Sequence, residues 1–194
     1  AESYPEKRSL DVDFKLLEKF DYELADELLE NPDLVLEAAG LAIEKINVPT
    51  LREQTFAPHI RFFSLPEDKS VLLRNIGAQH LEKLVCVEGI IKQITDVLPK
   101  LKVAGWKCKY CGNMYKVEQN KPELNQPAFC ECRHRDFQLQ VEESTFINYQ
   151  KIGIQEPLEL LKGNDQPTDL DVYLSDDMVN RVSAGDKIKI SGII

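Results

Sequence analysis

The sequence predicts an α+β protein, with helices in the first part of the chain and strands in the rest. Segments 14–29 and 32–46 carry apolar residues at the three- and four-residue spacing of amphipathic helices. From residue 84 onward, runs rich in Val and Ile alternate with polar residues, as strands do. Four of the five cysteines lie in close pairs between two of these runs. Together these features predict a helical part, a β part and an insertion held by a metal.

Composition limits the classes of protein to which the chain can belong. Its 194 residues suffice for up to three small domains, and 43% hydrophobic with 29% charged residues is ordinary for a soluble globular protein. No apolar run approaches the ~18–20 residues of a membrane span, so we expect no membrane partner. The first residues contain no secretory signal, and five cysteines suit a reduced intracellular protein better than a disulfide framework.

Charge is distributed unevenly along the chain. The net charge is −9, and residues 1–79 hold nine Lys and Arg against sixteen Asp and Glu. An overall acidic protein does not coat nucleic acid with its whole surface. Any contact with nucleic acid must therefore be a local patch further along the chain.

The helical part is expected to end before residue 80. Asn31 is expected to cap the second helix and Pro32 to open it, because Pro suits the first helical position. Residues 47–66 are expected to form a loop with a short extended piece at 60–63.

The β part contains five or six expected strands. The first, 84–94, has Gly89 at a bulge or sharp bend, and residues 96–102 continue into a turn and the second strand. Further strands are expected at 137–142, 144–154, 170–174 and 187–194, with one or two helical turns at 176–182. This order fits the five-stranded oligonucleotide-binding (OB) β-barrel with a long insertion. The expected subdomains are a helical bundle at 1–79, the barrel at 80–104 and 144–194, and a zinc-binding module at 105–143.

The cysteine pairs predict a zinc site. Cys108-x-x-Cys111-Gly112 has the spacing of a zinc-binding turn, and Gly112 can adopt the positive φ that closes it. Cys130-x-Cys132 places both side chains on one face if the segment is a strand. His134, two residues further on, is the rival of the cysteines for the fourth ligand position.

The metal is expected to be structural, and no catalytic residue is expected. Four soft ligands leave no open position, and the deaminase H-x-E signature is absent. Cys86 is read as a small buried residue rather than a ligand. His59 and His80 lack a partner at ligand spacing.

With these residues in place, the chain resembles the N-terminal region of the minichromosome maintenance (MCM) replicative DNA helicases, most of all the archaeal form. The resemblance rests on several motifs in order. They are Leu84-Val-Cys-Val-Glu-Gly-Ile-Ile, Thr95-Asp-Val-x-Pro-Lys-Leu, Cys108-x-x-Cys111-Gly112, Ser144-Thr-Phe, Ile154-Gln-Glu-Pro-Leu, Leu170-Asp-Val-Tyr-Leu, Asp176-Asp-Met-Val and Gly185-Asp-Lys-Ile-Lys-Ile-Ser-Gly.

The resemblance implies a homo-hexameric ring around single- or double-stranded DNA, with zinc modules joining two rings head to head. It also implies replication-initiation factors as partners, and a cytoplasmic, nucleoid-associated location in an archaeon or a nuclear one in a eukaryote. Gln155, Glu156 and Pro157 would begin the family's allosteric loop, which continues to about residue 167.

The family's motor is expected outside this chain. The sequence contains no G-x-x-x-x-G-K-[ST] loop, so ATP and Mg²⁺ would belong to a motor beyond Ile194. The family's basic β-hairpin would follow Gly192, and the ending inside a strand suggests a fragment. In the family, the second cysteine pair is often CxxC rather than CxC.

Four lysines are the candidates for contact with DNA, because single-strand binders combine a basic groove with surfaces on which bases stack. They are Lys92, Lys100, Lys102 and Lys151. An alternative function is a free-standing zinc-containing OB protein that binds single-stranded nucleic acid without forming a ring. An enzyme in its own right is disfavoured, because no base and nucleophile are paired in the sequence.

Overall fold

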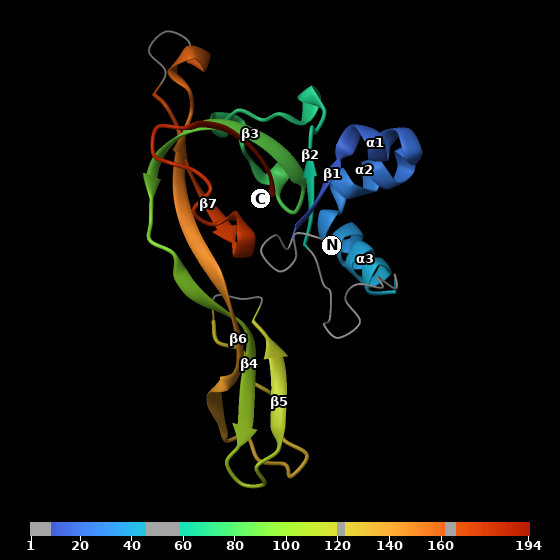
Figure 1. Cartoon of the computed structure of the whole chain (residues 1–194), viewed down its shortest axis with the longest axis vertical. Helices are drawn as coiled ribbons and strands as arrows, with labels where there is room; N and C mark the ends of the chain where they lie inside the picture. Colours follow the sequence, from blue (N-terminus) through green and yellow to red (C-terminus); the bar gives the residue numbers. More distant parts are fainter. Residues whose placement is uncertain (1–8, 46–58, 120–122, 162–165) are drawn as a thin grey trace. The chain divides into compact units, whose positions relative to one another are not determined.

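The computed structural model describes residues 9–45, 59–119, 123–161 and 166–194, and its fold is α+β as expected (Figure 1). The chain forms two compact units. The first unit comprises Ala1–Thr95, Lys151–Val172 and Arg181–Ile194, and the second comprises Asp96–Gln150 and Tyr173–Asn180. The boundaries of the three expected subdomains stay a prediction.

The helical segment of the first unit contains α1 (Phe14–Phe20), α2 (Tyr22–Glu30) and α3 (Pro32–Glu44). The expectation of one helix over 14–29 was wrong, because the chain is extended at Asp21, with φ −151° and ψ 104°. The Asp21 carboxylate accepts a hydrogen bond from the Leu24 amide at 3.1 Å and so starts a new helix. Pro32 opens α3 as expected.

Asn31 does not cap α3 with its side chain. Its Nδ2 donates instead to Glu27 Oε1 at 2.7 Å, back toward α2. This side chain is therefore engaged by the preceding helix, and the cap expected from the sequence is not made.

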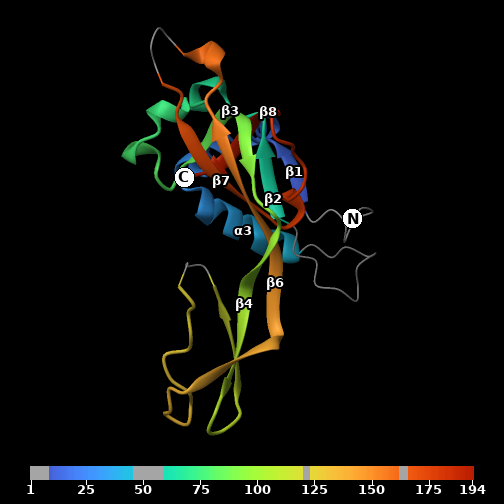
Figure 2. The same ribbon diagram turned by 90° about the vertical axis from the view of Figure 1, so that its left-hand side faces the viewer.

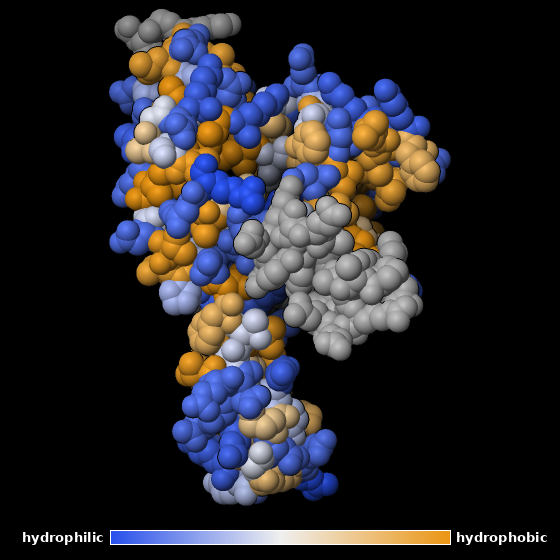
Figure 3. Space-filling view, viewed as in Figure 1, coloured by the Kyte–Doolittle hydropathy of each residue, from blue (hydrophilic) through white to orange (hydrophobic). Residues whose placement is uncertain are grey.

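A small apolar core holds the helical segment to the start of the β region. Phe14 and Leu28 are almost fully buried and pack in one cluster with Leu84 and Cys86. The outer face is less well covered, because Phe20 is 86% and Tyr22 68% exposed. Figure 3 shows apolar side chains gathered on the surface of α1 and α2.

Two short strands pair in parallel beside the helices. They are β1 (Ser9–Asp13) and β2 (His59–Phe63), in register from Ser9↔His59 to Asp13↔Phe63. β2 includes the extended piece expected at 60–63, and residues 47–58 of the loop expected over 47–66 lie outside the described residues. β1 was not expected, because five residues that include two aspartates give a weak strand signal.

The first unit also contains the strands β3 (Leu84–Ile94) and β8 (Lys187–Ile193), which pair antiparallel. The end of β6 (Phe137–Gln155) pairs with β3, and β7 (Asp169–Ser175) pairs with β6. Short 3-10 turns connect these strands. They are η2 (Glu67–Lys69), η3 (Leu73–Asn75), η4 (Ala78–His80), η5 (Leu158–Leu160) and, in the second unit, η6 (Asp176–Met178).

A bulge or sharp bend was expected at Gly89; Gly89 pairs in register with Ile188, and the bulge lies at Lys92. Ile91 pairs with Ile154 and Gln93 with Gly153, so Lys92 is the extra residue. Gly89 serves close packing, because a Cβ there would lie 3.2 Å from both Gln155 O and Ile154 Cβ.

The second unit contains β4 (Leu98–Cys108) and β5 (Met114–Glu118), with β4 between β5 and the first part of β6 (Figures 1 and 2). The strands expected at 137–142 and 144–154 form the single strand β6. The register shifts opposite Gly105, whose Cβ position would lie 2.9 Å from the Glu143 backbone oxygen. Ser144 Oγ spans the irregularity, accepting from Gly105 N at 2.9 Å and donating to Gln140 O at 2.6 Å.

Among the described residues, no helix is long and apolar enough to cross a membrane.

Candidate metal centre and nucleic-acid interface

The four paired cysteines meet at one end of the second unit. Their Sγ atoms all lie within 4.8 Å of one another. The Sγ atoms of Cys108 and Cys132 are 3.6 Å apart, and those of Cys111 and Cys130 are 3.3 Å apart. Four sulfurs around a tetrahedral zinc, each at about 2.3 Å from the metal, are about 3.8 Å apart. The cluster therefore has the size and the donor set of a four-thiolate metal site.

The first pair sits on the turn between β4 and β5. Gly112 has φ +78°, as expected, and its amide donates to Cys108 O at 3.0 Å, which closes the turn. The pKa of Cys108 is lowered, chiefly because the amide of Cys111 donates a hydrogen bond to its sulfur. The turn thus directs backbone N–H groups at the thiolates, as metal-binding turns do.

The second pair lies in a turn, and the expected strand over Cys130 and Cys132 was wrong. Arg133 N donates to Cys130 O at 2.8 Å, and Arg133 has φ +67°. The tight turn before β6, rather than strand alternation, brings both sulfurs to the same point. A positive φ at a non-glycine residue is uncommon, and sequence spacing does not reveal it.

The hydrogen bonds around the sulfurs shift their pKa values in opposite directions. The Tyr115 hydroxyl donates to Cys130 Sγ at 3.2 Å and lowers the pKa of Cys130 to about 6. The pKa of Cys111 is raised to about 12: the amide of Asn113 lowers it, but the bond to Cys130, burial and the other sulfurs together outweigh this. Cysteines bind a metal as thiolates, so a cation bound here would take the place of the thiol protons.

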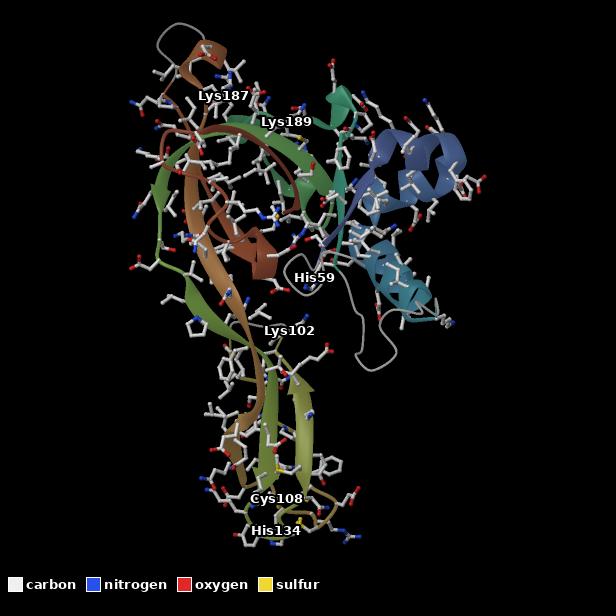
Figure 4. All side chains as sticks on the ribbon, viewed as in Figure 1. His59, Lys102, Cys108, His134, Lys187 and Lys189 are labelled. Atoms are coloured by element: carbon white, nitrogen blue, oxygen red, sulfur yellow. The ribbon has the colours of Figure 1, made fainter. Side chains whose placement is uncertain are left out.

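His134 is engaged outside the cluster. Its ring stacks on Tyr110 with centroids 3.9 Å apart and planes 19° apart. Among the described residues, the group that could hold a metal contains the four cysteines and no histidine. Figure 4 shows Cys108 and His134 at the same end of the β4–β5 pair. The geometry therefore favours the four-cysteine site over the rival set with His134.

The other cysteine and the remaining histidines lie elsewhere. Cys86 is 2% exposed in the core beside the helices, and burial raises the pKa of its thiol. This confirms that it is a packed side chain. His80 Nδ1 accepts from Gly77 N at 3.1 Å, and His59 opens β2.

Two of the four candidate lysines are paired with carboxylates of β7, all within the first unit. Lys92 Nζ lies 3.1 Å from Asp169 Oδ2, and Lys151 Nζ lies 2.7 Å from Asp171 Oδ2. All four side chains remain between 41% and 57% exposed. The pairs therefore partly neutralise the expected basic surface while leaving it open to solvent. Sequence reasoning missed the aspartates, although their alternation at 169 and 171 on a strand was visible.

The other two candidate lysines are exposed on β4 in the second unit. Lys100 Nζ lies over the Tyr149 ring, 4.8 Å from its centroid. Lys102 follows two residues later and is labelled in Figure 4. Basic and aromatic side chains thus occur together on neighbouring strands, β4 and β6.

The candidate allosteric loop begins where β6 ends, and its residues 162–165 lie outside the described residues. Gln155 is the last residue of β6, and Glu156 N donates to Thr168 O at 3.1 Å, so the loop closes on itself. Glu156 is 1% exposed, and within the described part of the chain neither carboxylate oxygen has a hydrogen-bond partner. Arg74 Nε lies 3.7 Å from Glu156 Oε1. The arginine also donates to Leu160 O at 2.9 Å, so it holds the start of the loop at two points.

Fold and site together define a class: an α+β protein in which a sheet of OB type carries a four-cysteine lobe. The MCM OB domain family matches residues 71–194, and the MCM N-terminal domain family matches residues 3–68. The chain therefore belongs to the MCM family. The matches also confirm the expected OB architecture.

Individual relatives cover nearly the whole chain. The minichromosome maintenance protein MCM of Saccharolobus solfataricus is 29% identical over 198 residues, covering 97% of this chain and 29% of that protein. The DNA replication licensing factor mcm-6 of Caenorhabditis briggsae is 31% identical over 98% of this chain and 24% of that protein. The chain thus spans less than a third of the length of each of these relatives.

A solved structure shares the fold. The crystal structure of the N-terminal domain of an archaeal MCM superposes with a TM-score of 0.81 at 30% identity. The match covers 99% of this chain and 78% of that one. The described elements therefore form the N-terminal part of an MCM protein.

Proposed function

We propose that this chain is the DNA-binding and ring-forming region of a replicative DNA helicase. The observation that carries the proposal is the match of 99% of the chain to the N-terminal domain of an archaeal MCM. Relatives named as replication licensing factors support the same process. ATP hydrolysis, with Mg²⁺, would take place in a motor outside this sequence, which contains no G-x-x-x-x-G-K-[ST] loop.

Single-stranded DNA would be held along the OB strands by Lys92, Lys100, Lys102 and Lys151. Lys92 protrudes at a β-bulge, which re-aims a side chain out of the regular ladder. The ion pairs of Lys92 and Lys151 are exposed, so a phosphate oxygen can replace each carboxylate at small cost. Because the chain has a net charge of −9, binding by one copy should be weak and sensitive to salt.

A ring explains how weak sites would act together. Six copies around one strand repeat the same lysines, and each contact after the first is intramolecular. The ring would also encircle double-stranded DNA, and initiation factors would load it. In a cell it would act where the chromosome is, in the nucleoid or the nucleus.

Zn²⁺ would be held by Cys108, Cys111, Cys130 and Cys132 in a structural role. The fit rests on sulfurs within 4.8 Å of one another and on amides that donate to them. Such an ion supplies cross-links between two turns that share little apolar core. The lobe that it fixes would meet its counterpart in a second ring and so pair the two hexamers.

The test combines size in solution with DNA binding. Sedimentation of the chain at rising concentration, with and without a single-stranded oligonucleotide, should reveal species several times the 22.2 kDa monomer. Lys92→Ala/Lys100→Ala/Lys151→Ala should weaken binding of that oligonucleotide and flatten its salt dependence.

The matched control removes three exposed lysines of the helical segment, Lys15, Lys19 and Lys45, which gives the same change in net charge. Equal losses in both variants would show a net-charge effect and refute the assigned surface. A chain that binds single strands yet stays monomeric under all conditions would favour the free-standing OB protein instead.

A further inference from the structure

Two tyrosines of the second unit stack on each other at the surface. The rings of Tyr149 on β6 and Tyr173 on β7 lie with centroids 5.6 Å apart and planes 14° apart. Tyr173 is 59% exposed, and Leu98, which pairs with Tyr149 across the ladder, is 60% exposed. Partly buried Tyr149 is therefore flanked by the exposed Tyr173 ring and the exposed Leu98.

A cation completes this surface. Lys100 Nζ lies 4.8 Å from the Tyr149 centroid. An ammonium over an aromatic face is attracted to the ring quadrupole, which holds the lysine beside the tyrosines. Flat aromatic faces next to a fixed positive charge are what a nucleotide requires, since its base is a flat ring system and its phosphate is an anion.

We propose that Tyr149 and Tyr173 form a base-stacking site for single-stranded DNA, with Lys100, beside Tyr149, attracting a phosphate further along the strand. This deepens the proposed function and rests on it. A base stacks on the exposed Tyr173 ring, and Tyr149 supports that ring from behind as the second member of the stack. The site is tolerant of sequence, because every base offers a π-face.

The stack also has a simpler role, which is to stabilise the sheet. Cross-strand aromatic pairs contribute to sheet stability whether or not a ligand is present. The two roles differ in what they require: sheet packing needs apolar area, whereas base stacking needs a flat ring. Tyr173→Leu keeps much of the apolar area and removes the ring, and Tyr173→Phe keeps the ring and removes only the hydroxyl.

The experiment measures binding of a fluorescein-labelled oligo(dT) of fifteen nucleotides by anisotropy at several salt concentrations. Tyr173→Phe should bind like the unmodified chain, and Tyr173→Leu about tenfold more weakly, within the range for loss of one stacked base. The salt slope should be unchanged in both, because no phosphate contact is lost. An oligomer of the same length made of abasic residues should bind Tyr173→Leu and the unmodified chain equally.

A second readout locates the contact. Oligo(dT) carrying 5-iododeoxyuridine, irradiated in the complex, should cross-link to Tyr173 or Tyr149, as identified by mass spectrometry. Tyr173→Leu that binds oligo(dT) as tightly as Tyr173→Phe, with cross-links elsewhere, would overturn the stacking site.

If the unmodified chain binds no oligo(dT), the proposed function itself fails. If Lys92→Ala/Lys100→Ala/Lys151→Ala weakens binding of oligo(dT) and Tyr173→Leu does not, only the stacking site fails. Circular dichroism melting of both tyrosine variants checks that the sheet is retained.

Discussion

Replacing Asp169 and Asp171 by asparagine should strengthen the binding of single-stranded DNA. In the free chain these carboxylates lie 3.1 Å from Lys92 Nζ and 2.7 Å from Lys151 Nζ. A phosphate that approaches either lysine must displace its carboxylate and is also repelled by it. Asn keeps the size of the side chain and removes the charge, so both lysines become available without a change of shape.

The expected size of the effect follows from the exposure of the pairs. Exposed ion pairs contribute about 0.2–1 kcal/mol each, which corresponds to about 1.4- to 5-fold in affinity for each lysine released. The two aspartates are two residues apart on β7, so their effects should not be fully additive. Salt screens the exposed carboxylates as well, so the repulsion that they exert on a phosphate weakens as salt rises. The double variant should therefore bind about 3- to 10-fold more tightly at low salt and lose that gain as salt rises.

The assay measures the fluorescence anisotropy of labelled oligo(dT) at salt concentrations from about 50 to about 200 mM. Contacts between lysines and phosphates weaken strongly over this range. Asp26→Asn/Asp68→Asn is the control, since these exposed residues give the same charge change away from the lysines. Unchanged or weaker binding by Asp169→Asn/Asp171→Asn would refute the reasoning. An equal gain in affinity for the control variant would show that the change in net charge alone causes the effect.

Two further predictions concern the second unit, and a third concerns α3 of the first unit. Cys132→Ser should lower the zinc content of the chain, as measured with a chromogenic chelator. His134→Ala should retain about one zinc per chain, because the histidine stacks on Tyr110 and does not join the four sulfurs. The reverse result would establish the ligand set of three cysteines and His134. Gly105→Ala should destabilise this unit by about 1–3 kcal/mol, because its Cβ would lie 2.9 Å from the Glu143 backbone, as followed by Trp106 fluorescence in urea. Gly40→Ala, at a helical position with nothing within 4 Å, should instead stabilise by about 0.5–1 kcal/mol, and a loss there would contradict the packing argument.

Periodicity predicted most elements of the fold, and short-range hydrogen bonds explain the departures. The apolar spacing over 14–29 is continuous, yet the chain breaks at Asp21 because its carboxylate caps the next helix. Likewise, 137–142 and 144–154 merge into β6 because Ser144 bonds to both Gly105 and Gln140 across the irregularity. A hydrophobic pattern records which face is buried, and it does not record which backbone group a polar side chain will bind.

One part of the candidate site could be predicted from the sequence, and another part could not. The metal ligands could be predicted because the two pairs are local in sequence, and each pair needs only a turn to bring its sulfurs together. The partners of Lys92 and Lys151 could not, since Asp169 and Asp171 follow after an intervening loop and only the pairing of β7 with β6 brings that strand into the sheet. Tyr149 and Tyr173 were missed for this reason too. A lysine read from sequence is a charge, and its neighbours decide whether that charge is available.

The role of the cysteines also follows from how little else holds their lobe. Among the described residues of the second unit, a cluster of five buried residues, with partly buried ones packed against it, includes Cys108 and Cys130, with 1% and 0% exposure. In a core this small, removing the metal would leave two buried members as thiols without their cross-link. The first unit has a separate core around Phe14 and Leu28 that contains none of the four sulfurs. Folding of the lobe should therefore depend on the metal, whereas the helical segment and the strands packed on it should not.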